Sequence, residues 1–244
     1  MDLLSLNKAI ECRIVQRLNR FVVAVDVMGQ SARAWINNTG RLHELLVPGR
    51  KAFCLPRGGS TRTSYRLFAV EEKDQGALID TQFQMRAFEQ CLEQRLLPWL
   101  RNACAWKRNV RLNRSVIDYR LQCGADEVYL EVKSAVLREG HYAMYPDCPS
   151  TRGRRHIQEL TEHVQRGGKA CIVFVAALPD VECFRPNHMA DAKLALLLAD
   201  AHRAGVEVRS VGMFYVPQRG TVVLSHADLP VDLLWKSGSP GGCS

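Results

Sequence analysis

The stretch from Ser115 to Ala135 constrains the fold of this chain more than any other. Two runs of alternating apolar and polar residues flank the segment Cys123-Gly124-Ala125-Asp126. Alternation with a period of two is typical of half-buried strands, and Gly and Asp between two such runs favour a tight turn. The sequence therefore predicts a β-hairpin. Pairing outward from its turn collects apolar residues on one face: Ile117 with Val132, Tyr119 with Leu130, and Leu121 with Val128.

The other face of this hairpin carries charge. If the four turn residues form the loop, Gln122 faces Glu127, and Asp118 falls directly opposite Glu131. Lys133 follows two residues later and points to the same face. Directly opposed like charges weaken an antiparallel pair unless another group offsets the repulsion. The register thus predicts that two carboxylates and an ammonium converge.

A divalent cation would offset that repulsion. Carboxylate oxygens suit Mg²⁺ or Mn²⁺, so we expect Asp118 and Glu131 to be metal ligands. The ion would carry an activated water or steady a leaving oxygen, and Lys133 would orient the nucleophile or stabilise negative charge. This is the outline of a phosphodiester-cleaving site. The alternative is a solvated hairpin face on which acids and bases occur at random, and the register favours the site.

Composition limits the class of protein. The 244 residues suffice for one large or two modest domains, and 47% hydrophobic residues can bury a core. A net charge of +8 favours a polyanionic partner such as DNA, with RNA left open. Nine cysteines without a C-x-x-C pair argue against a disulfide framework or a structural zinc site. With no long apolar run and no signal peptide, we expect a cytoplasmic protein with no membrane partner.

Residues 1–76 read as a series of short strands. Five or so such strands in about 70 residues predict a Greek-key barrel of the OB type, which commonly binds single-stranded nucleic acid. The clearest strands cover Phe21 to Val27, Ala32 to Ile36, Lys51 to Leu55 and Tyr65 to Val70.

Two basic loops lie within this predicted barrel. The loop from Asn37 to Leu46 reads as a cap and one helical turn, in which Arg41 either binds a phosphate or only accompanies turn residues. Arg57, Arg62 and Arg66 surround a Gly-Gly loop, as either a phosphate-contacting patch or an ordinary solvated loop.

We place a domain boundary in the polar segment Glu71 to Gly76 and a second domain at 77–236. Its first helix should begin at Asp80 or Thr81 and end at Leu97, before Pro98. Glu89 falls on or beside the buried side of this helix. It is either a rim residue or a third carboxylate directed at the hairpin site.

Mixed α/β order continues to the end of this domain. We expect further strands and helices over Ala103 to Arg111, Ser150 to Gly167, Lys169 to Ala176, Asp191 to Arg203 and Val206 to Val216, then a flexible tail at 237–244. This order, with acids on a central hairpin, is typical of a restriction-endonuclease-like core.

The helix predicted after Ser150 begins with an unusual group of basic residues. Arginines near a helix N-terminus oppose the helix dipole unless a phosphate or carboxylate is nearby. We therefore predict that this turn contacts nucleic acid through Arg152, Arg154, Arg155 and His156.

Five segments taken in order resemble the sugar fermentation stimulation protein A (SfsA) family: N-T-G-R-L-H-E-L-L-V-P-G at 38–49, D-T-Q-F at 80–83, I-D-Y-R-L at 117–121, E-V-K-S at 131–134, and Y-P-D with R-G-R-R-H-I-Q-E-L at 145–160. The resemblance implies an OB-like domain, a PD-(D/E)XK nuclease-like domain and DNA binding. It nominates Asp118, Glu131 and Lys133 as the nuclease-like core, with Glu89 as a further candidate. The chain departs from the family pattern at Met85, Val116 and Ser150-Thr151, all outside that core.

Two functions therefore remain open. The first is a metal-dependent nuclease with its site on the hairpin. The second is a non-catalytic, largely sequence-nonspecific DNA-binding or regulatory protein linked to sugar metabolism.

Overall fold

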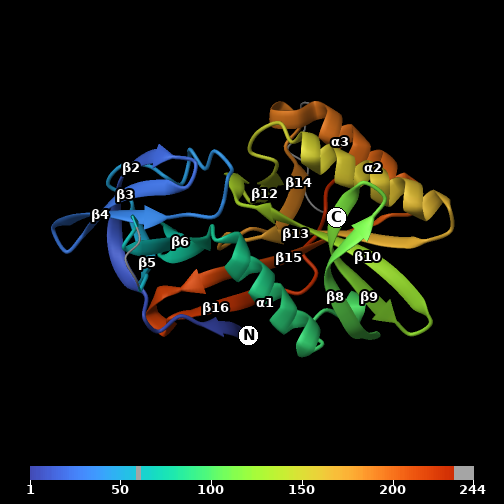
Figure 1. Cartoon of the computed structure of the whole chain (residues 1–244), viewed down its shortest axis with the longest axis horizontal. Helices are drawn as coiled ribbons and strands as arrows, with labels where there is room; N and C mark the ends of the chain where they lie inside the picture. The colour runs from blue at the N-terminus through green and yellow to red at the C-terminus, as the bar shows by residue number, and fades with distance from the viewer. Residues whose placement is uncertain (59–61, 234–244) are drawn as a thin grey trace. The chain divides into compact units, whose positions relative to one another are not determined.

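The computed structural model describes residues 1–58 and 62–233, which pack into two compact units (Figure 1). The first unit contains residues 1–90, 177–180 and 212–225, and the second contains 91–176, 181–211 and the described residues from 226 onward. The predicted division into 1–76 and 77–236 stays a prediction about which segments fold independently. The predicted tail at 237–244 lies outside the described residues.

Five strands of the first unit close into a barrel. They are β2 (Ile10–Asn19), β3 (Val22–Val27), β4 (Gln30–Trp35), β5 (Lys51–Pro56) and β6 (Tyr65–Glu72). Antiparallel pairs join β4 to β3, β3 to β2, β2 to β5 and β5 to β6. A parallel pairing of β4 with β6 completes the ring. The expected OB-like barrel is confirmed. Four of its strands overlap the predicted ranges, whereas β2 lies outside them.

The remaining elements of the first unit extend this barrel. The polar segment Glu71–Gly76 is a tight turn between β6 and β7 (Gln75–Leu78), in which Lys73 and Asp74 adopt positive φ angles of 49° and 61°. The strand β1 (Asp2–Ser5) pairs with β16 (Thr221–His226). Phe53 and Phe68 pack edge-on against Tyr215, with ring centroids 5.2 and 4.9 Å away, and form part of the core.

The helix α1 (Thr81–Glu93) starts as predicted but ends four residues before Leu97. Arg95 adopts a left-handed φ of 53°, and the Leu96 N–H donates to the Cys91 carbonyl at 2.9 Å. This closing pattern satisfies the last carbonyls of a helix. The local termination therefore acts before Pro98, which opens a short 3₁₀ turn (Pro98–Leu100).

A mixed sheet forms the centre of the second unit. Its order is the first half of β15 (Glu207–Val216), β13 (Lys169–Ala176), β10 (Asp126–Ala135), β9 (Ser115–Cys123) and β8 (Ala103–Leu112). The strands β10 and β13 are parallel and are connected through α2 (Thr151–Gln165). Figure 1 shows α2 beside α3 (His188–Arg203), and α2 also packs on β13. Every residue of β13 except Lys169 is buried, as its apolar run predicts.

A second, three-stranded sheet was not predicted. It contains β11 (Leu137–Glu139), β12 (Tyr142–Tyr145) and β14 (Cys183–Pro186). These strands have three or four residues each, too few to show a period. In the part of the chain that the structure describes, no helix is long and apolar enough to cross a bilayer.

Candidate functional site

The hairpin has the predicted register near its turn. Cross-strand pairs run from Cys123–Asp126 through Gln122–Glu127 and Leu121–Val128 to Tyr119–Leu130. Beyond that pair, side chains replace the backbone ladder. The Val132 N–H donates to Asp118 Oδ2 at 2.8 Å, and the Asp118 N–H donates to Glu131 Oε2 at 3.3 Å. The structure thus brings Asp118 and Glu131 together, although the expected Ile117–Val132 pair is not part of the described ladder.

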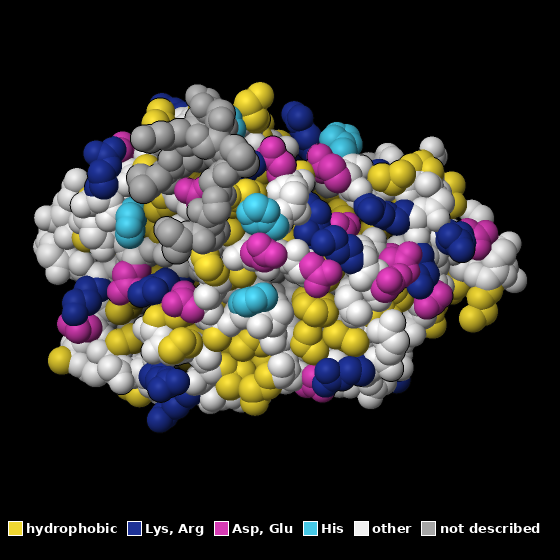
Figure 2. Space-filling view, turned by 180° about the vertical axis from the view of Figure 1, so that it is seen from behind, with side chains coloured by type: hydrophobic (Ala, Val, Ile, Leu, Met, Phe, Trp, Pro, Cys, Tyr) yellow, Lys and Arg dark blue, Asp and Glu magenta, His cyan; other side chains and the backbone are white. Residues whose placement is uncertain are grey.

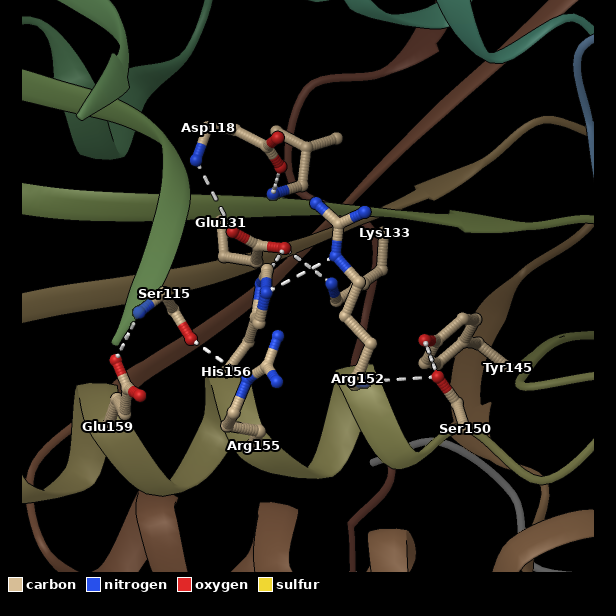
Figure 3. Close-up of polar contacts among 12 residues, drawn as sticks. Ser115, Asp118, Glu131, Lys133, Tyr145, Ser150, Arg152, Arg155, His156 and Glu159 are labelled. Atoms are coloured by element: carbon tan, nitrogen blue, oxygen red, sulfur yellow. Dashed lines mark hydrogen bonds and ion pairs between the residues drawn. The ribbon is translucent and has the colours of Figure 1, made fainter. Parts of the chain in front are cut away.

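Glu131 lies at the centre of the site (Figure 3). Its Oε1 accepts hydrogen bonds from the Lys133 ammonium and, at 2.6 Å, from Nδ1 of His156. Glu131 is 2% exposed and His156 is 1% exposed. Buried carboxylates are stable only when paired and hydrogen-bonded, and these two neighbours provide both.

One face of α2 approaches the hairpin. Nε of Arg152 donates to Nε2 of His156 at 3.3 Å, and Nε of Arg155 donates to Oγ of Ser115 at 3.3 Å. The Ser115 N–H in turn donates to Oε2 of Glu159 at 3.0 Å. Residues three and four apart share a helix face, so the spacing of Arg152, His156 and Glu159 explains their common direction. That spacing was the available signal for a role of Glu159, which sequence reasoning missed.

The start of α2 is capped from two directions. Oγ of Ser150 accepts from the Gly153 N–H at 3.0 Å, so Ser150 caps the helix that was predicted to follow it. Oδ2 of Asp191 accepts from the Ser150 N–H at 2.9 Å and lies 3.5 Å from Nε of Arg154. This carboxylate offsets part of the arginine charge that the helix dipole disfavours.

Asp191 reaches that position because α3 is interrupted there. Its φ of −154° and ψ of 81° are not helical, and its Oδ1 accepts from the Leu194 N–H at 3.0 Å. The helix was predicted to begin at Asp191, but a first turn capped by Asn187 precedes it.

Charge in the site is unevenly stabilised. Burial, and then the Glu131 carboxylate, raise the pKa of Asp118 to about 6, although the Val132 N–H and Lys133 act in the opposite direction. Burial also opposes ionisation of Glu131, but Lys133 and the His156 hydrogen bond together hold its pKa below the ordinary value. Burial alone would lower the pKa of Lys133, yet the Glu131 carboxylate keeps it above the ordinary value. At neutral pH the Glu131–Lys133 pair is therefore ionised, while Asp118 is close to its titration range.

The remaining residues predicted for the second domain are dispersed. Arg152 and Arg155 are exposed, Arg154 is half-buried beside Asp191, and His156 is buried against Glu131 rather than at the surface. Glu89 is buried on α1 in the first unit, and its catalytic role stays a prediction.

Arg41 lies in a loop of the first unit whose backbone carbonyls accept hydrogen bonds from Arg17. Its own side chain is exposed, while its carbonyl and that of Gly40 each accept from Nη1 of Arg17 at 2.6 Å. Arg17 also donates to the carbonyl of Asn19 at 3.1 Å. Sequence reasoning missed Arg17, because nothing in its local pattern indicates contacts with a loop more than 20 residues away.

Arg57 and Arg62 differ in their surroundings. Arg57 donates to Oγ1 of Thr63 at 2.6 Å and lies over the Trp35 ring, 5.2 Å from its centroid. Arg62 is exposed and follows residues 59–61, which lie outside the described ranges. Contacts of either side chain with nucleic acid stay predictions.

A second buried carboxylate cluster surrounds Asp80, the N-cap of α1. Its Oδ1 accepts from Nδ2 of Asn37 at 2.8 Å, from Nη2 of Arg66 at 2.7 Å and from the Phe83 N–H at 3.0 Å. Its Oδ2 accepts from Nε of Arg66 at 2.5 Å. Arg66 also stacks on Trp35, so this arginine serves the interior of the first unit.

The donor chemistry at Asp118 and Glu131 fits an open site for a hard cation. Oδ1 of Asp118 accepts no hydrogen bond from the described residues, and Oε2 of Glu131 accepts only the 3.3 Å contact from the Asp118 N–H. Among residues 1–58 and 62–233, no group of three or more His, Cys, Asp or Glu could hold a metal. Mg²⁺ commonly binds through one or two carboxylates and completes its shell with water and phosphate.

Two family models and several relatives match the chain. The model of the sugar fermentation stimulation protein RE domain matches residues 82–219, and the SfsA N-terminal OB domain matches residues 15–79. A sugar fermentation stimulation protein homolog of Pyrococcus furiosus is 46% identical over 213 residues, 87% of this chain and 92% of the relative. A homolog of Archaeoglobus fulgidus is 46% identical over 231 residues, 95% of this chain and 99% of the relative.

A solved structure agrees with these matches. The Pyrococcus furiosus SfsA structure, described as a complex with Ca²⁺, has a TM-score of 0.90 and 43% identity, covering 95% of this chain and 99% of that one. Both domains and nearly the whole length are thus shared. The chain belongs to the sugar fermentation stimulation protein family.

Proposed function

We propose that this protein is a metal-dependent phosphodiesterase of the PD-(D/E)XK type that acts on nucleic acid. The observation that carries the proposal is the Asp118–Glu131 pair. The carboxylates of Asp118 and Glu131 lie side by side in a partly buried site. Among the described residues, Lys133 forms an ion pair with Glu131, and Asp118 has no such cationic partner. A carboxylate whose pKa is raised by burial and by a like charge is a functional-site candidate.

We propose Mg²⁺ or Mn²⁺ as the cofactor, with Asp118 and Glu131 as its ligands. The Pyrococcus furiosus relative was solved with Ca²⁺, which prefers the same oxygen ligands. When bound, such an ion lowers the pKa of a coordinated water and neutralises charge on a phosphoryl oxygen. Hydrogen bonds from Lys133 and the Val132 N–H orient the two carboxylates that would bind the ion.

Lys133 has the role of a cation in this proposal. Because the Glu131 carboxylate keeps its pKa above the ordinary value, the ammonium stays protonated near neutral pH. It can therefore donate a hydrogen bond but cannot accept a proton. We assign it to the orientation of the attacking water and to stabilisation of the negative charge that develops on the phosphate.

Arg152 and Arg155 are the residues we assign to the substrate phosphates. Both side chains are exposed on the face of α2 that carries His156, and each uses only its Nε in the contacts that the described residues form. The Nη groups can form the paired hydrogen bonds that a guanidinium makes with phosphate.

Calorimetric titration with Mn²⁺ tests the metal site directly. The chain offers a matched pair on one hairpin: Asp118→Asn removes a proposed ligand, whereas Asp126→Asn removes an exposed carboxylate that pairs with Lys169. We expect Mn²⁺ binding to disappear in Asp118→Asn and to persist in Asp126→Asn. Equal binding by both variants would overturn the assignment.

Cleavage assays on the same proteins test the reaction. Labelled single- and double-stranded DNA and RNA are incubated with Mn²⁺ and wild type, Lys133→Met, Asp118→Asn or Asp126→Asn. We expect cleavage by wild type and Asp126→Asn only, and the substrates cleaved identify the preferred strand. Cleavage that survives loss of both Asp118 and Lys133 would contradict the proposed site.

Binding of nucleic acid without cleavage is the second candidate function. Its support is the exposed pair Arg152 and Arg155 at the start of α2. On the face seen in Figure 2, basic side chains alternate with acidic ones, so the net charge of +8 is not gathered into one basic area there. If this function holds, DNA binding will weaken as salt rises and will persist in EDTA without any product.

A further inference from the structure

His156 is the most buried polar side chain beside the proposed metal ligands, and the roles above leave it unused. We infer that His156 is a positioning residue: its neutral imidazole, protonated at Nδ1, fixes the Glu131 carboxylate so that Oε2 is left for the metal ion. The last part of this inference rests on the proposed function. The tautomer and the hold on Glu131 do not.

The two partners of the His156 ring, Glu131 and Arg152, determine which of its nitrogens carries the proton. The Nε of Arg152 lies 3.3 Å from Nε2 of His156 and is placed to donate. A guanidinium has donors only, so Nε2 must offer its lone pair. The single proton of a neutral imidazole is then on Nδ1, where it donates to Oε1 of Glu131 at 2.6 Å.

The Nδ1–H bond restricts how the Glu131 carboxylate can turn. Oε1 already accepts from both Lys133 and His156, and its surroundings are buried. Rotation of the carboxylate would break both bonds, which cost more to lose because they are charge-assisted. Oε2 therefore stays directed at the backbone of Asp118, and within residues 1–58 and 62–233 it accepts one hydrogen bond, of 3.3 Å, from that N–H.

Partners that orient a ligating carboxylate commonly change metal affinity when they are removed. His156 differs from a residue that only fills the core, because its contribution depends on one donor atom. Asparagine places an amide nitrogen at the position of Nδ1, whereas leucine has a similar volume and no donor. This difference gives a matched pair of variants at one position.

The first experiment measures the tautomer without metal. In ¹⁵N-histidine-labelled protein, the ring nitrogens of His156 are assigned by their loss in His156→Asn. We expect a protonated Nδ1 and a bare Nε2 in wild type, and Nδ1 to stay protonated in Arg152→Ala, because the Glu131 carboxylate still accepts from it. Protonated Nε2 in wild type would overturn the inference.

The second experiment measures Mn²⁺ affinity by calorimetry, with circular dichroism to confirm folding. We expect His156→Leu to weaken binding by roughly 10–100-fold and His156→Asn to remain within about threefold of wild type. Equal affinities of the two variants would show that the donor atom at this position does not affect metal binding and would overturn the positioning role.

The two experiments separate the inference from the proposed function. If wild type binds no Mn²⁺, the proposed metal site fails, while the ¹⁵N spectrum still decides whether His156 donates to Glu131 from Nδ1. If wild type binds Mn²⁺ and the tautomer is reversed, only the inference fails.

Discussion

Two clusters in this protein, around Asp80 and around Asp118, each contain a carboxylate with little exposure to solvent. They differ in how many hydrogen-bond donors surround that carboxylate. Asp80 is 1% exposed, and four donor atoms of Asn37, Arg66 and Phe83 saturate it. Among the described residues, Asp118 receives one hydrogen bond, from the Val132 N–H, and it has Glu131 as a neighbour. Burial of an acid therefore does not distinguish a functional site from a structural one. The distinction is whether the chain itself supplies all the partners that the ionised group needs.

The largest expected effect concerns the completed cluster. Asp80→Ala leaves the Arg66 guanidinium and the first turn of α1 without their acceptor, so we expect a loss of about 3–5 kcal/mol in the free energy of unfolding. Urea unfolding measures this loss. Glu11→Ala is the control. Oε1 of Glu11 lies 3.8 Å from Nζ of Lys51, and because Glu11 is exposed to solvent, such an ion pair contributes at most about 1 kcal/mol. A similar loss in both variants would mean that Asp80 is not a structural centre.

The second prediction concerns the incomplete cluster in the presence of metal. A ligand that binds only the folded state stabilises it, by about 2.7 kcal/mol at one hundred times its dissociation constant. We expect Mn²⁺ to raise the melting temperature of wild type and Asp126→Asn, and to leave Asp118→Asn unchanged. A shift in Asp118→Asn would show that the ion stabilises the protein elsewhere.

The third prediction is that replacing a carboxylate raises the free energy of unfolding, whereas in the first prediction the replacement lowers it. The folded pKa of Asp118 is about 6, against an ordinary value of 3.8, so the folded protein holds this proton more tightly than the unfolded chain. The resulting stability is fully present below pH 3.8 and is lost as the pH rises toward about 6. Without metal, Asp118→Asn avoids that loss, and we expect it to be more stable than wild type near neutral pH by on the order of 2 kcal/mol, allowing for partial solvation.

Urea unfolding in EDTA at about pH 7 and about pH 4 measures this difference, which should be largest at the higher pH. Asp126→Asn serves as the control, because its carboxylate is exposed. A destabilised Asp118→Asn at neutral pH would mean that the chain does supply enough partners for Asp118, and the comparison with Asp80 would fail.

The smallest expected effect separates two arginines proposed to contact nucleic acid. The Nη groups of Arg152 form no hydrogen bond with the described residues, whereas Arg57 stacks on Trp35 and donates to Thr63. We expect Arg152→Gln to reduce the slope of log affinity against log salt by about one, and Arg57→Gln to leave it unchanged. Fluorescence anisotropy with labelled DNA at several salt concentrations measures both slopes. Equal reductions would place Arg57 among the phosphate contacts.

Local pattern predicts much of the fold. Period-two alternation identifies the barrel strands β3 and β4 and the hairpin, and the register of the hairpin near its turn follows from Gly124 and its neighbours. The strand β13 follows from its continuous apolar run, and α2 from its cap at Ser150. The strands β11, β12 and β14 are too short to carry a pattern, and their pairing joins segments about 40 residues apart.

Only part of the candidate site can be predicted from local sequence patterns. Asp118, Glu131 and Lys133 come from one hairpin, so their convergence needs only its register. His156 was predicted to contact nucleic acid at the surface, because the arginines beside it in the sequence do not indicate whether its side chain is buried. Its position depends on how α2 packs against the hairpin. The role of Asp191 depends on an interruption of α3 that no residue pattern announces.

The strand β10 is held on both sides, by β9 through the hairpin and by β13 in a parallel ladder that extends over Glu131 and Lys133. A slip of one residue would turn both side chains to the opposite face of the sheet, and the second ladder opposes such a slip. The orientation of Glu131 and Lys133 is therefore fixed by β13 as well as by the hairpin turn. Residues inserted between Gly124 and Ala125 would enlarge an exposed loop while β13 keeps Glu131 and Lys133 in place, so this turn is where the protein can accept a fused peptide or reporter.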